Sequence, residues 1–431
     1  MKKAFKKIVI AIITWEARIA LWRYRPKIIA VTGSVGKTST KDAIHAGFSE
    51  ERFVRKSKKS FNSEIGVPLT VLGCESGWAS VFKWLKNITY GLSFILLPNH
   101  YPKWLILEVG ADRPGDIKSL TKWIRPDIAV ITGIPDIPSH VEFFESVEQV
   151  AEEKRALAEA LTPEGTLVVN GDDARAMEMR IDFRGVCVTY GFSGNNDFVA
   201  SHDEIFYENG KPAGMQFRVN HAGSSVPVVL RDAIGRSHIY SALAAVAVGV
   251  SSGLDVIKVA RGLSSGKTPP GRMRVIGGLR DTTIIDDSYN ASPNAMHSAI
   301  EALKDIETKG RKIAVLGDML ELGRHTSEAH KEIGKVVADV ADILITVGIR
   351  ARGIADSAMD AGMSEKNILQ YEQGEAERAG EELEVRLEEG DVILVKGSQG
   401  MRLEKTVKAI MAEPIRAKEL LVRQEPEWLS R

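Results

Sequence analysis

A short stretch near the start of the chain has the residue types and spacing of a phosphate-binding loop. It begins at Val31 and reads VTGSVGKTST. Its glycines, Gly33 and Gly36, allow backbone N–H groups to wrap around a phosphate, and the Lys37 side chain can reach the outer oxygens. The hydroxyl of Thr38 is a ligand that Mg²⁺ accepts. The general spacing G-x-x-x-x-G-K-[ST] would need a glycine at Val31, so this loop is shorter. We interpret it as a nucleotide-binding loop, with an ordinary glycine-containing turn as the alternative.

Polar groups also follow other apolar runs that predict buried strands. Glu108 stands near the end of one such run, and His140 follows another. Three polar clusters come later, reading DDSYNASP from Asp286, GDMLELG from Gly317 and KGSQGMR from Lys396. One cluster could be a helix cap, because Ser, Asp and Asn cap helices well. Several at the carboxyl ends of parallel strands predict a ligand-binding crevice.

The elements that must position these groups alternate between strand and helix. This alternation predicts a mostly parallel, doubly wound α/β sheet. In the first part of the chain we expect strands at residues 27–30, 103–109, 127–134 and 167–170, and a helix at 146–161 that carries Lys154. Residues 185–230 change to short alternating runs with Asn-Gly and Ala-Gly turns, which predict a small antiparallel part. An Ala-rich helix is expected at residues 237–252.

A second α/β unit is expected after residues 264–271, a Ser-, Gly- and Pro-rich linker. Its expected strands are residues 283–286, 312–316, 342–347 and 391–395. The predicted organisation is therefore a P-loop NTPase-type central domain followed by a Rossmann-like C-terminal domain. The boundaries that we expect are an N-terminal helix at 1–25, the central domain at 26–268, the C-terminal domain at 269–412 and a polar tail at 413–431.

The composition excludes some classes of function. Among 431 residues, Lys and Arg together number 57, as do Asp and Glu, so no global charge favours nucleic acid as a partner. The two cysteines, Cys74 and Cys187, are too few for a disulfide framework or a zinc cluster. They are typical of core residues in a reducing cytosol, so we expect a cytoplasmic protein.

Residues 2–25 combine positive charge with an apolar stripe. The apolar run at residues 8–13 is too short to span a membrane, for which roughly 20 residues are needed, and no cleavage site suggests a signal peptide. Helical spacing places these side chains on one face: Phe5, Ile8, Ile12, Trp15, Ile19 and Trp22. Such a helix can lie on an anionic membrane surface or against a partner protein, or it can pack on the chain's own core.

The ordered set of motifs resembles the Mur ligases over about residues 27–412. Besides the stretches above, the set includes NSEIGVPLT from Asn62. The resemblance is strongest to members that join D-alanyl-D-alanine to a muramoyl tripeptide. It implies that ATP phosphorylates a carboxylate of a cell-wall peptide precursor and that an amino acid or dipeptide then attacks the acyl phosphate. ATP and Mg²⁺ are the implied cofactors.

The resemblance also implies roles for single residues. The ATP-binding residues would be Gly33, Ser34, Gly36, Lys37, Thr38, Ser39, Asn290 and Arg272. Thr38 would ligate a first Mg²⁺, and Glu108 and His140 would ligate a second one. Lys37, Lys154, His140 and Arg272 would serve catalysis, with Lys154 carbamylated by CO₂ or, alternatively, a solvated lysine. Asp318, Lys396 and Ser398 would face the incoming amino compound.

The sequence departs from the family pattern ahead of the loop. Only about 26 residues precede it, whereas the family has a whole domain there that holds UDP. We therefore expect either that UDP is bound in a different way, or that the acceptor, the peptide whose carboxylate is activated, is linked to a lipid or is not a murein peptide. A non-catalytic nucleotide-binding module recruited to the membrane by its first helix is the alternative from another class. Peripheral contact with the inner face of the membrane, or with a partner protein, is expected through residues 2–25.

Overall fold

The computed structural model describes residues 3–78, 80–138, 141–181 and 183–429, and the side chains from residue 6 onward within these ranges. Its first part is built on one long sheet in which the strands follow the order β2-β3-β1-β4-β5-β6-β7-β8-β9. The strands from β2 to β7 run parallel, and β7, β8 and β9 are antiparallel. Their bounds are β1 Lys27–Thr32, β2 Val54–Lys56, β3 Trp104–Glu108, β4 Ile128–Ile131, β5 Thr166–Asn170, β6 Val186–Gly191, β7 Phe198–Glu208, β8 Lys211–His221 and β9 Ser224–Arg231.

Helices cover both faces of this sheet, which explains why its parallel strands are continuous apolar runs. In β1, Ile28 and Ala30 face one apolar core, and Ile29 and Val31 face the other. The first core is closed by α1 Lys3–Tyr24, α3 Gly66–Leu72, α4 Val81–Leu96, α5 Asp116–Thr121, α6 Val147–Glu159 and α7 Ala174–Glu178. The second is closed by α2 Lys37–Ser49, α8 Arg236–Ser251 and α9 Val256–Ser265.

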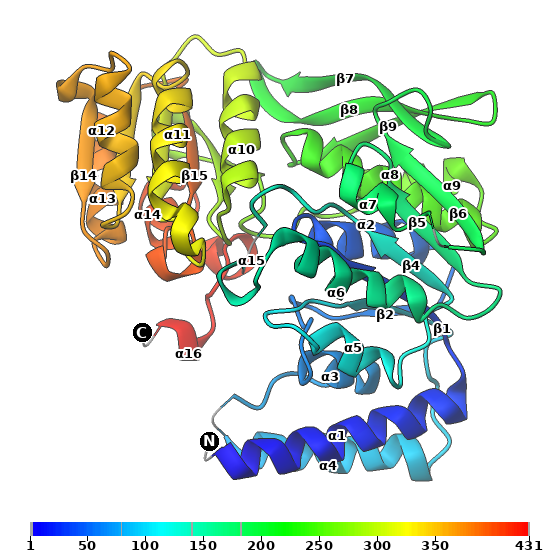
Figure 1. Cartoon of the computed structure of the whole chain (residues 1–431). Helices are drawn as coiled ribbons and strands as arrows, with labels where there is room; N and C mark the ends of the chain where they lie inside the picture. The colour runs from blue at the N-terminus through cyan, green and yellow to red at the C-terminus, as the bar shows by residue number, and fades with distance from the viewer. Residues whose placement is uncertain (1–2, 79, 139–140, 182, 430–431) are drawn as a thin grey trace.

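The second part is a separate sheet of order β10-β11-β15-β12-β13-β14, parallel except for β10 (Figure 1). Its strands are β10 Arg274–Gly277, β11 Thr283–Asp287, β12 Lys312–Gly317, β13 Ile343–Val347, β14 Ile368–Tyr371 and β15 Val392–Lys396. Its helices are α10 Pro293–Asp305, α11 Thr326–Ala338, α12 Arg352–Asp360, α13 Ala376–Arg386, α14 Glu404–Ile410, α15 Ala417–Leu420 and α16 Pro426–Leu429.

The fold class predicted from the sequence is confirmed, including the antiparallel β7–β9 part. Strands β2, β10 and β14 were not predicted from the sequence. β2 and β14 are edge strands of three and four residues, too short for a clear pattern, and β10 is recognised only by its pairing with β11.

The C-terminal residues, for which the sequence indicates only a polar tail, fold onto the second sheet. Leu420 and Leu421 enter the core beside α13 and α14. Arg423 is buried, and its Nη1 donates to Glu404 Oε2 at 3.0 Å and to the Ser288 carbonyl at 3.2 Å. Glu427 then pairs with Lys83 of α4 at 3.1 Å, so this segment also contacts the first part of the chain.

Helix α1 packs on the chain's own core and also leaves an apolar face outside. Val9, Ile13 and Ala17 are buried, whereas Trp15 and Trp22 of the predicted stripe are exposed. Packing on the chain's own core is thus confirmed for one face of the helix, and contact of the other face with a membrane or a partner stays a prediction. None of the helices in the described ranges combines the length and apolarity that crossing a bilayer requires.

A carboxyl group is buried without a partner between α1 and α4. Glu16 is 0% exposed, and neither carboxylate oxygen has a hydrogen-bond partner among the described residues. Gly91 of α4 makes room for it, since a Cβ there would lie 2.2 Å from Glu16 Oε2. Burial raises the pKa of Glu16 to about 7.

We expect Glu16→Gln to raise the melting temperature at pH 8 and to leave it nearly unchanged at pH 5. The carboxyl of the unfolded chain ionises near its ordinary pKa of 4.5, whereas the folded one keeps its proton up to about 7. The folded protein therefore loses stability as pH rises through this window, by at most roughly 3 kcal/mol. Thermal unfolding across this pH range measures it, with the exposed Glu159→Gln as control. An equal shift at both pH values would contradict an ionisation effect.

Candidate active site

The phosphate-binding loop joins the end of β1 to the start of α2, as predicted. Gly33 has a φ of 148° and Gly36 a φ of 77°, conformations that side chains disfavour. A Cβ on Gly33 would lie 1.9 Å from Thr132 Oγ1, so the neighbouring strand end also requires a glycine there. The loop is tied to that strand end, because Ser34 N donates to the Gly133 carbonyl at 2.8 Å.

The loop holds groups that fit an anion. Lys37 Nζ donates to the loop's own carbonyls, Gly33 O at 2.8 Å and Ser34 O at 3.4 Å, and burial lowers its pKa. The hydroxyls of Thr32 and Ser34 are buried without a hydrogen-bond partner among the described residues. An ammonium and unpaired hydroxyls at the start of α2 match the needs of a nucleotide's phosphates.

A hydroxyl and a carboxylate meet directly below the loop. Thr38 Oγ1 lies 3.0 Å and 2.9 Å from the two oxygens of Glu108, which is almost fully buried at the end of β3. Ser60 Oγ lies 2.7 Å from Thr38 Oγ1, and Asn62 Nδ2 donates to Glu108 Oε1 at 3.3 Å. These hard oxygen donors fit Mg²⁺, which takes few protein ligands and completes its shell with phosphate and water. In the described ranges no three acidic, His or Cys groups gather to hold a metal by themselves.

Lys41 lies on the buried side of Glu108. Its Nζ is 3.6 Å from Glu108 Oε2 and from Asp42 Oδ1, and it donates to the Lys59 carbonyl at 3.0 Å. Burial lowers the pKa of Lys41, and the two carboxylates oppose that change. The sequence analysis gave Lys41, Ser60 and Asn62 no role, although the loop motif and the NSEIGVPLT motif contain or adjoin them.

Arg272 reaches the loop from the linker between the two sheets. Its Nη2 donates to Thr38 Oγ1 at 2.9 Å and lies 3.4 Å from Ser60 Oγ. Its guanidinium also stacks 4.2 Å from the centre of the Tyr289 ring, which follows β11. The two parts of the chain therefore meet at Thr38.

The backbone around Arg272 is fixed by buried polar groups on both sides. Asp286 Oδ2 accepts from Gly271 N at 3.1 Å, and Asp287 Oδ1 accepts from Met273 N at 3.2 Å. His238 Nε2 donates to the Arg272 carbonyl at 2.9 Å. Burial raises the pKa of Asp286 to about 6 and lowers that of His238. The polar cluster after β11 thus positions an arginine, a role that its sequence does not reveal.

Lys154 lies on α6 with its side chain buried. Burial and the nearby Lys37 cation lower its pKa to about 7. Its neighbour Glu153 is engaged elsewhere, accepting from Ile117 N at 2.6 Å and Gly115 N at 2.7 Å at the start of α5. Lys154 is therefore a buried amine, not the solvated lysine of the alternative interpretation.

Asp318, Lys396 and Ser398, the three residues predicted to face the amino compound, lie at the carboxyl edge of the second sheet. Lys396 Nζ contacts Asp287 Oδ2 at 2.6 Å and the Asn290 carbonyl at 3.0 Å. Ser398 Oγ accepts from Leu320 N at 2.9 Å. Asp318 is fully buried, and its Oδ1 accepts from Ala351 N at 2.8 Å while its Oδ2 pairs with Arg350 Nη1 at 3.2 Å. In the structure the side chains of Asp318 and Ser398 hold loops together.

Three of the predicted site residues remain to be placed: Ser39, Asn290 and His140. Ser39 lies half-buried in the first turn of α2, and the side chain of Asn290 is exposed beside the Lys396 contact. His140 lies outside the described residues.

The chain matches two known domain families in the order of its two sheets. Residues 31–249 match the Mur ligase middle domain, and residues 271–399 match the glutamate ligase domain of Mur ligases. Over 400 residues the chain is 31% identical to a UDP-N-acetylmuramoyl-tripeptide–D-alanyl-D-alanine ligase of Bacillus subtilis, covering 93% of this chain and 79% of that protein. The chain belongs to the Mur ligase family. The resemblance drawn from the motifs is thereby confirmed, as is the prediction of an ATP-dependent ligase.

Solved structures agree with this assignment. A MurF ligase of Thermotoga maritima in complex with ADP superposes with a TM-score of 0.74 at 27% identity, covering 96% of this chain and 84% of that one. A MurF of Acinetobacter baumannii, 23% identical, gives a TM-score of 0.75 and covers 93% of this chain and 79% of that one, which shows the shared fold. The ligase of Escherichia coli with the same name as the Bacillus relative is 28% identical over 390 residues, covering 89% of this Mur ligase and 76% of that protein.

Proposed function

We propose that this Mur ligase activates a carboxylate of a cell-wall peptide precursor with ATP and joins it to an amino compound, D-alanyl-D-alanine being the first candidate. The relatives that share this domain pair carry the name of that reaction. The observation that carries the proposal is the contact of Arg272 with Thr38, because it brings the C-terminal unit onto the phosphate-binding loop.

The proposed chemistry explains why cations surround the loop. A carboxylate is a poor electrophile, so one of its oxygens attacks the γ-phosphorus and ADP leaves. The amine then attacks the carbonyl carbon, phosphate leaves with the bridging oxygen, and the amine loses a proton. The first step brings two anions together, so it needs positive charge that is already in place. Lys37 supplies that charge from the loop, and Arg272 supplies it from the C-terminal unit.

Mg²⁺ is part of this proposal. The Thr38 hydroxyl and the Glu108 carboxylate would hold it, with His140 as a further proposed ligand from the family pattern. When bound, the ion neutralises charge on the phosphates. Asn62 orients Glu108 through the hydrogen bond to Oε1, and Lys41 offsets its negative charge from behind.

We propose that Lys154 reacts with CO₂ to form a carbamate. The ammonium first loses one proton, and the neutral amine nitrogen then bonds to the carbon of CO₂ and releases a second proton. Together these two losses turn a buried cation into an anion near Lys37. A pKa of about 7 leaves a substantial fraction of the neutral, reactive amine at neutral pH.

We expect ¹³CO₂ to produce a carbamate carbon signal in the NMR spectrum of the protein. The signal should grow as pH rises, because only the neutral amine reacts and the pKa of Lys154 is about 7. Lys154→Ala should remove the signal, and the exposed Lys122→Ala should keep it. A signal that survives Lys154→Ala would assign the carbamate elsewhere.

A lipid-linked muropeptide is the second candidate for the acceptor. The exposed, basic and Trp-bearing face of α1 favours it. Since ATP and the precursors meet in the cytoplasm, we place the reaction there, at the inner face of the membrane for a lipid-linked acceptor. Asp318, Lys396 and Ser398 are proposed to line or support the site of the amino compound.

The test is ADP release with UDP-linked and lipid-linked muramoyl tripeptides, each with and without D-alanyl-D-alanine. We expect release to depend on both the tripeptide and the dipeptide. Preference for the UDP-linked or the lipid-linked form decides between the two acceptors. ATP binding without amine-dependent ADP release would support a non-catalytic nucleotide-binding module instead.

A further inference from the structure

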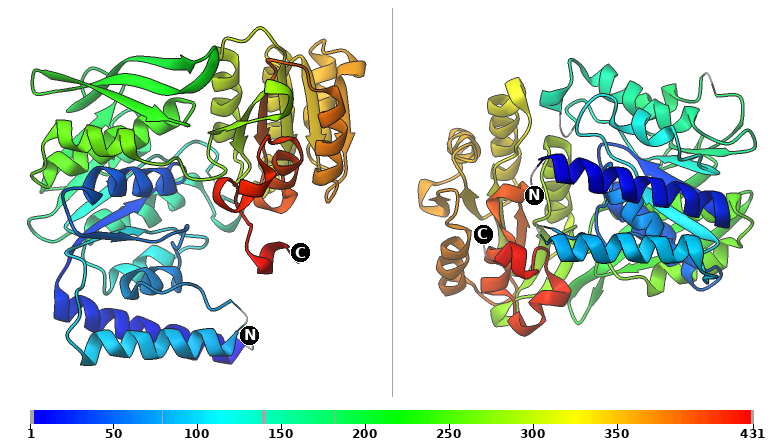
Figure 2. Two further views of the ribbon diagram at one scale, coloured as in Figure 1. Left: turned by 180° about the vertical axis from the view of Figure 1, so that it is seen from behind. Right: turned by 90° about the horizontal axis from the view of Figure 1, so that it is seen from below.

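The outward face of α1 has a regular composition that the ligase reaction does not use. Alternate spacings of three and four residues leave one exposed stripe on the helix, which consists of Ile8, Ala11, Trp15, Arg18 and Trp22, and the exposed Arg25 follows directly after the helix. Trp22 is 73% exposed and Trp15 is 54% exposed. Viewed from below, α1 lies uncovered across the molecule (Figure 2). Singly exposed apolar residues are common, but a run of this kind on one helix marks an interaction site.

Helix α4 extends this face. It lies beside α1 at the end of the molecule farthest from β7–β9 (Figures 1 and 2), and Tyr24 Oη donates to the Phe94 carbonyl at 2.9 Å. Phe82 is 84% exposed and Leu96 is 72% exposed, with Leu85 between them also outside. The two helices therefore form one apolar platform, which we call the α1–α4 face.

The charge of the α1–α4 face is entirely positive within the described residues. Neither helix has an exposed acidic side chain, since Glu16 is buried and α4 contains no Asp or Glu. The exposed cations of the two helices and the residue that follows α1 are Lys6, Lys7, Arg18, Arg23, Arg25, Lys83 and Lys86, of which Lys83 pairs with Glu427 of the C-terminal segment. A basic amphipathic surface of this kind suits the anionic face of a bilayer.

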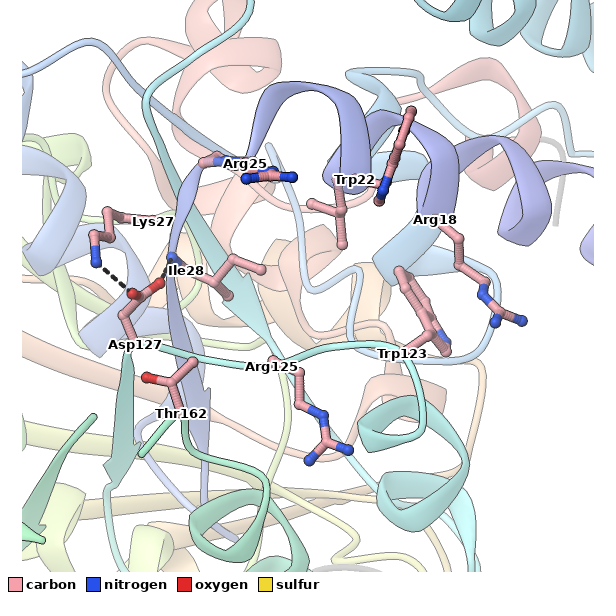
Figure 3. A pocket seen from close by; sticks show the side chains of 11 residues that line it. Arg18, Trp22, Arg25, Lys27, Ile28, Trp123, Arg125, Asp127 and Thr162 are labelled. Atoms are coloured by element: carbon pink, nitrogen blue, oxygen red, sulfur yellow. Dashed lines mark hydrogen bonds and ion pairs between the residues drawn. The ribbon is translucent and has the colours of Figure 1, made fainter. Parts of the chain in front are cut away.

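A cavity opens where α1 meets the sheet. It has a volume of about 500 Å³ and is lined by Arg18, Arg25 and Arg125 together with Trp22 and Trp123. Figure 3 shows that Arg18, Trp22 and Arg25 come from α1 and the residue after it, whereas Trp123 and Arg125 come from the segment ahead of β4. Arg18, Trp22 and Arg25 are therefore shared between the cavity and the exposed stripe.

The arginines of this cavity are free to take an anion. Asp127, the carboxylate in the lining, is already held by Lys27 Nζ at 2.7 Å and by Ile28 N at 2.8 Å. No ion pair joins Arg18, Arg25 or Arg125 to a carboxylate of the described residues. Guanidinium groups bind phosphate oxygens through two donors at once, and tryptophan is typical of the bilayer interface.

We propose that the α1–α4 face binds anionic phospholipid and that the arginine cavity takes a lipid headgroup phosphate. The apolar side chains would enter the acyl boundary, while the arginines would stay at headgroup level. The cavity lies at the start of β1, and the phosphate-binding loop follows the end of β1, so the two sites occupy opposite edges of the sheet. We therefore expect binding to lipid vesicles to need neither ATP nor a substrate of the proposed ligase reaction.

Co-sedimentation with vesicles tests this proposal without any substrate. We expect the whole protein to bind vesicles of phosphatidylglycerol and phosphatidylcholine at least about tenfold more tightly than phosphatidylcholine alone. Arg18→Ala with Arg25→Ala should weaken binding on the order of thirtyfold, since each cation near the surface contributes about fivefold. Phe82→Ser should also weaken it, and Arg261→Ala on the distant helix α9 should not.

Several outcomes would overturn the proposal. One is equal binding to both kinds of vesicle, and another is unchanged binding after the double arginine replacement in a protein with unaltered melting temperature. Inorganic phosphate binding that needs Arg18 and Arg25, without any vesicle binding, would make the cavity a site for a free anion. A dimer in solution that Trp22→Ser separates would assign the α1–α4 face to a second copy of the chain. ADP release from soluble substrates is unaffected by these variants, so failure here leaves the proposed ligase reaction standing.

Discussion

Replacement of Lys37 by alanine is expected to lower the rate of ADP release by about a hundredfold to a thousandfold or more. Loss of one preorganised group that stabilises transition-state charge has an effect of this size in other enzymes. Within the part of the chain that the structure describes, Lys37 Nζ donates only to the carbonyls of its own loop, so it can turn to the phosphates without breaking an ion pair there. Steady-state ADP release with a muramoyl tripeptide and D-alanyl-D-alanine measures the effect.

The control for this variant is Lys58→Ala. Lys58 is highly exposed and pairs with Glu75 on the surface at 2.7 Å, an interaction of small energy. We expect its turnover to stay near that of the unchanged protein. Turnover that survives in Lys37→Ala would contradict a role for the loop in phosphoryl transfer.

Replacement of Arg272 by alanine is expected to lower kcat by about a hundredfold to a thousandfold with a smaller change in KM for ATP. An arginine that completes a phosphoryl-transfer site acts mainly in the transition state, where comparable residues contribute 10³–10⁵. Arg272 reaches Thr38 from the other unit of the chain, so its loss also removes the contact that joins the units there. Steady-state kinetics with ATP varied separate the two constants.

The variant Arg272→Lys separates the effect of the positive charge on kcat from the effect of the planar guanidinium group. A lysine keeps the charge but loses the planar stacking on Tyr289, so we expect an intermediate kcat. The exposed Arg416→Ala, which removes only surface ion pairs with Glu413 and Glu419, is the control. A kcat unchanged in Arg272→Ala would place the functional arginine elsewhere.

The sequence was sufficient to predict features that depend on local patterns. Buried parallel strands are apolar runs, and the glycines around Lys37 need no distant partner to be recognised. The ends of β1 and β3 place Thr38 and Glu108 together, as expected, because parallel strands deliver their carboxyl ends to one edge.

Features that depend on contacts between distant segments could not be predicted from the sequence. The cluster after β11 suggested a ligand site, yet Asp286 and Asp287 bind the backbone beside Arg272, more than ten residues away in the sequence. The Trp-bearing stripe of α1 was recognised, but Glu16 in its buried face and the exposed Phe82 of α4 become meaningful only when the two helices are side by side.

The central claim is that a carboxylate oxygen attacks the γ-phosphate at the Lys37 loop. The most direct measurement uses UDP-N-acetylmuramoyl tripeptide whose terminal carboxylate carries ¹⁸O, or the lipid-linked form if that is the acceptor used. With ATP and D-alanyl-D-alanine, we expect each phosphate released to contain one ¹⁸O atom for each amide formed. Phosphate without ¹⁸O, or release of AMP and pyrophosphate, would rule out an acyl phosphate formed at this loop.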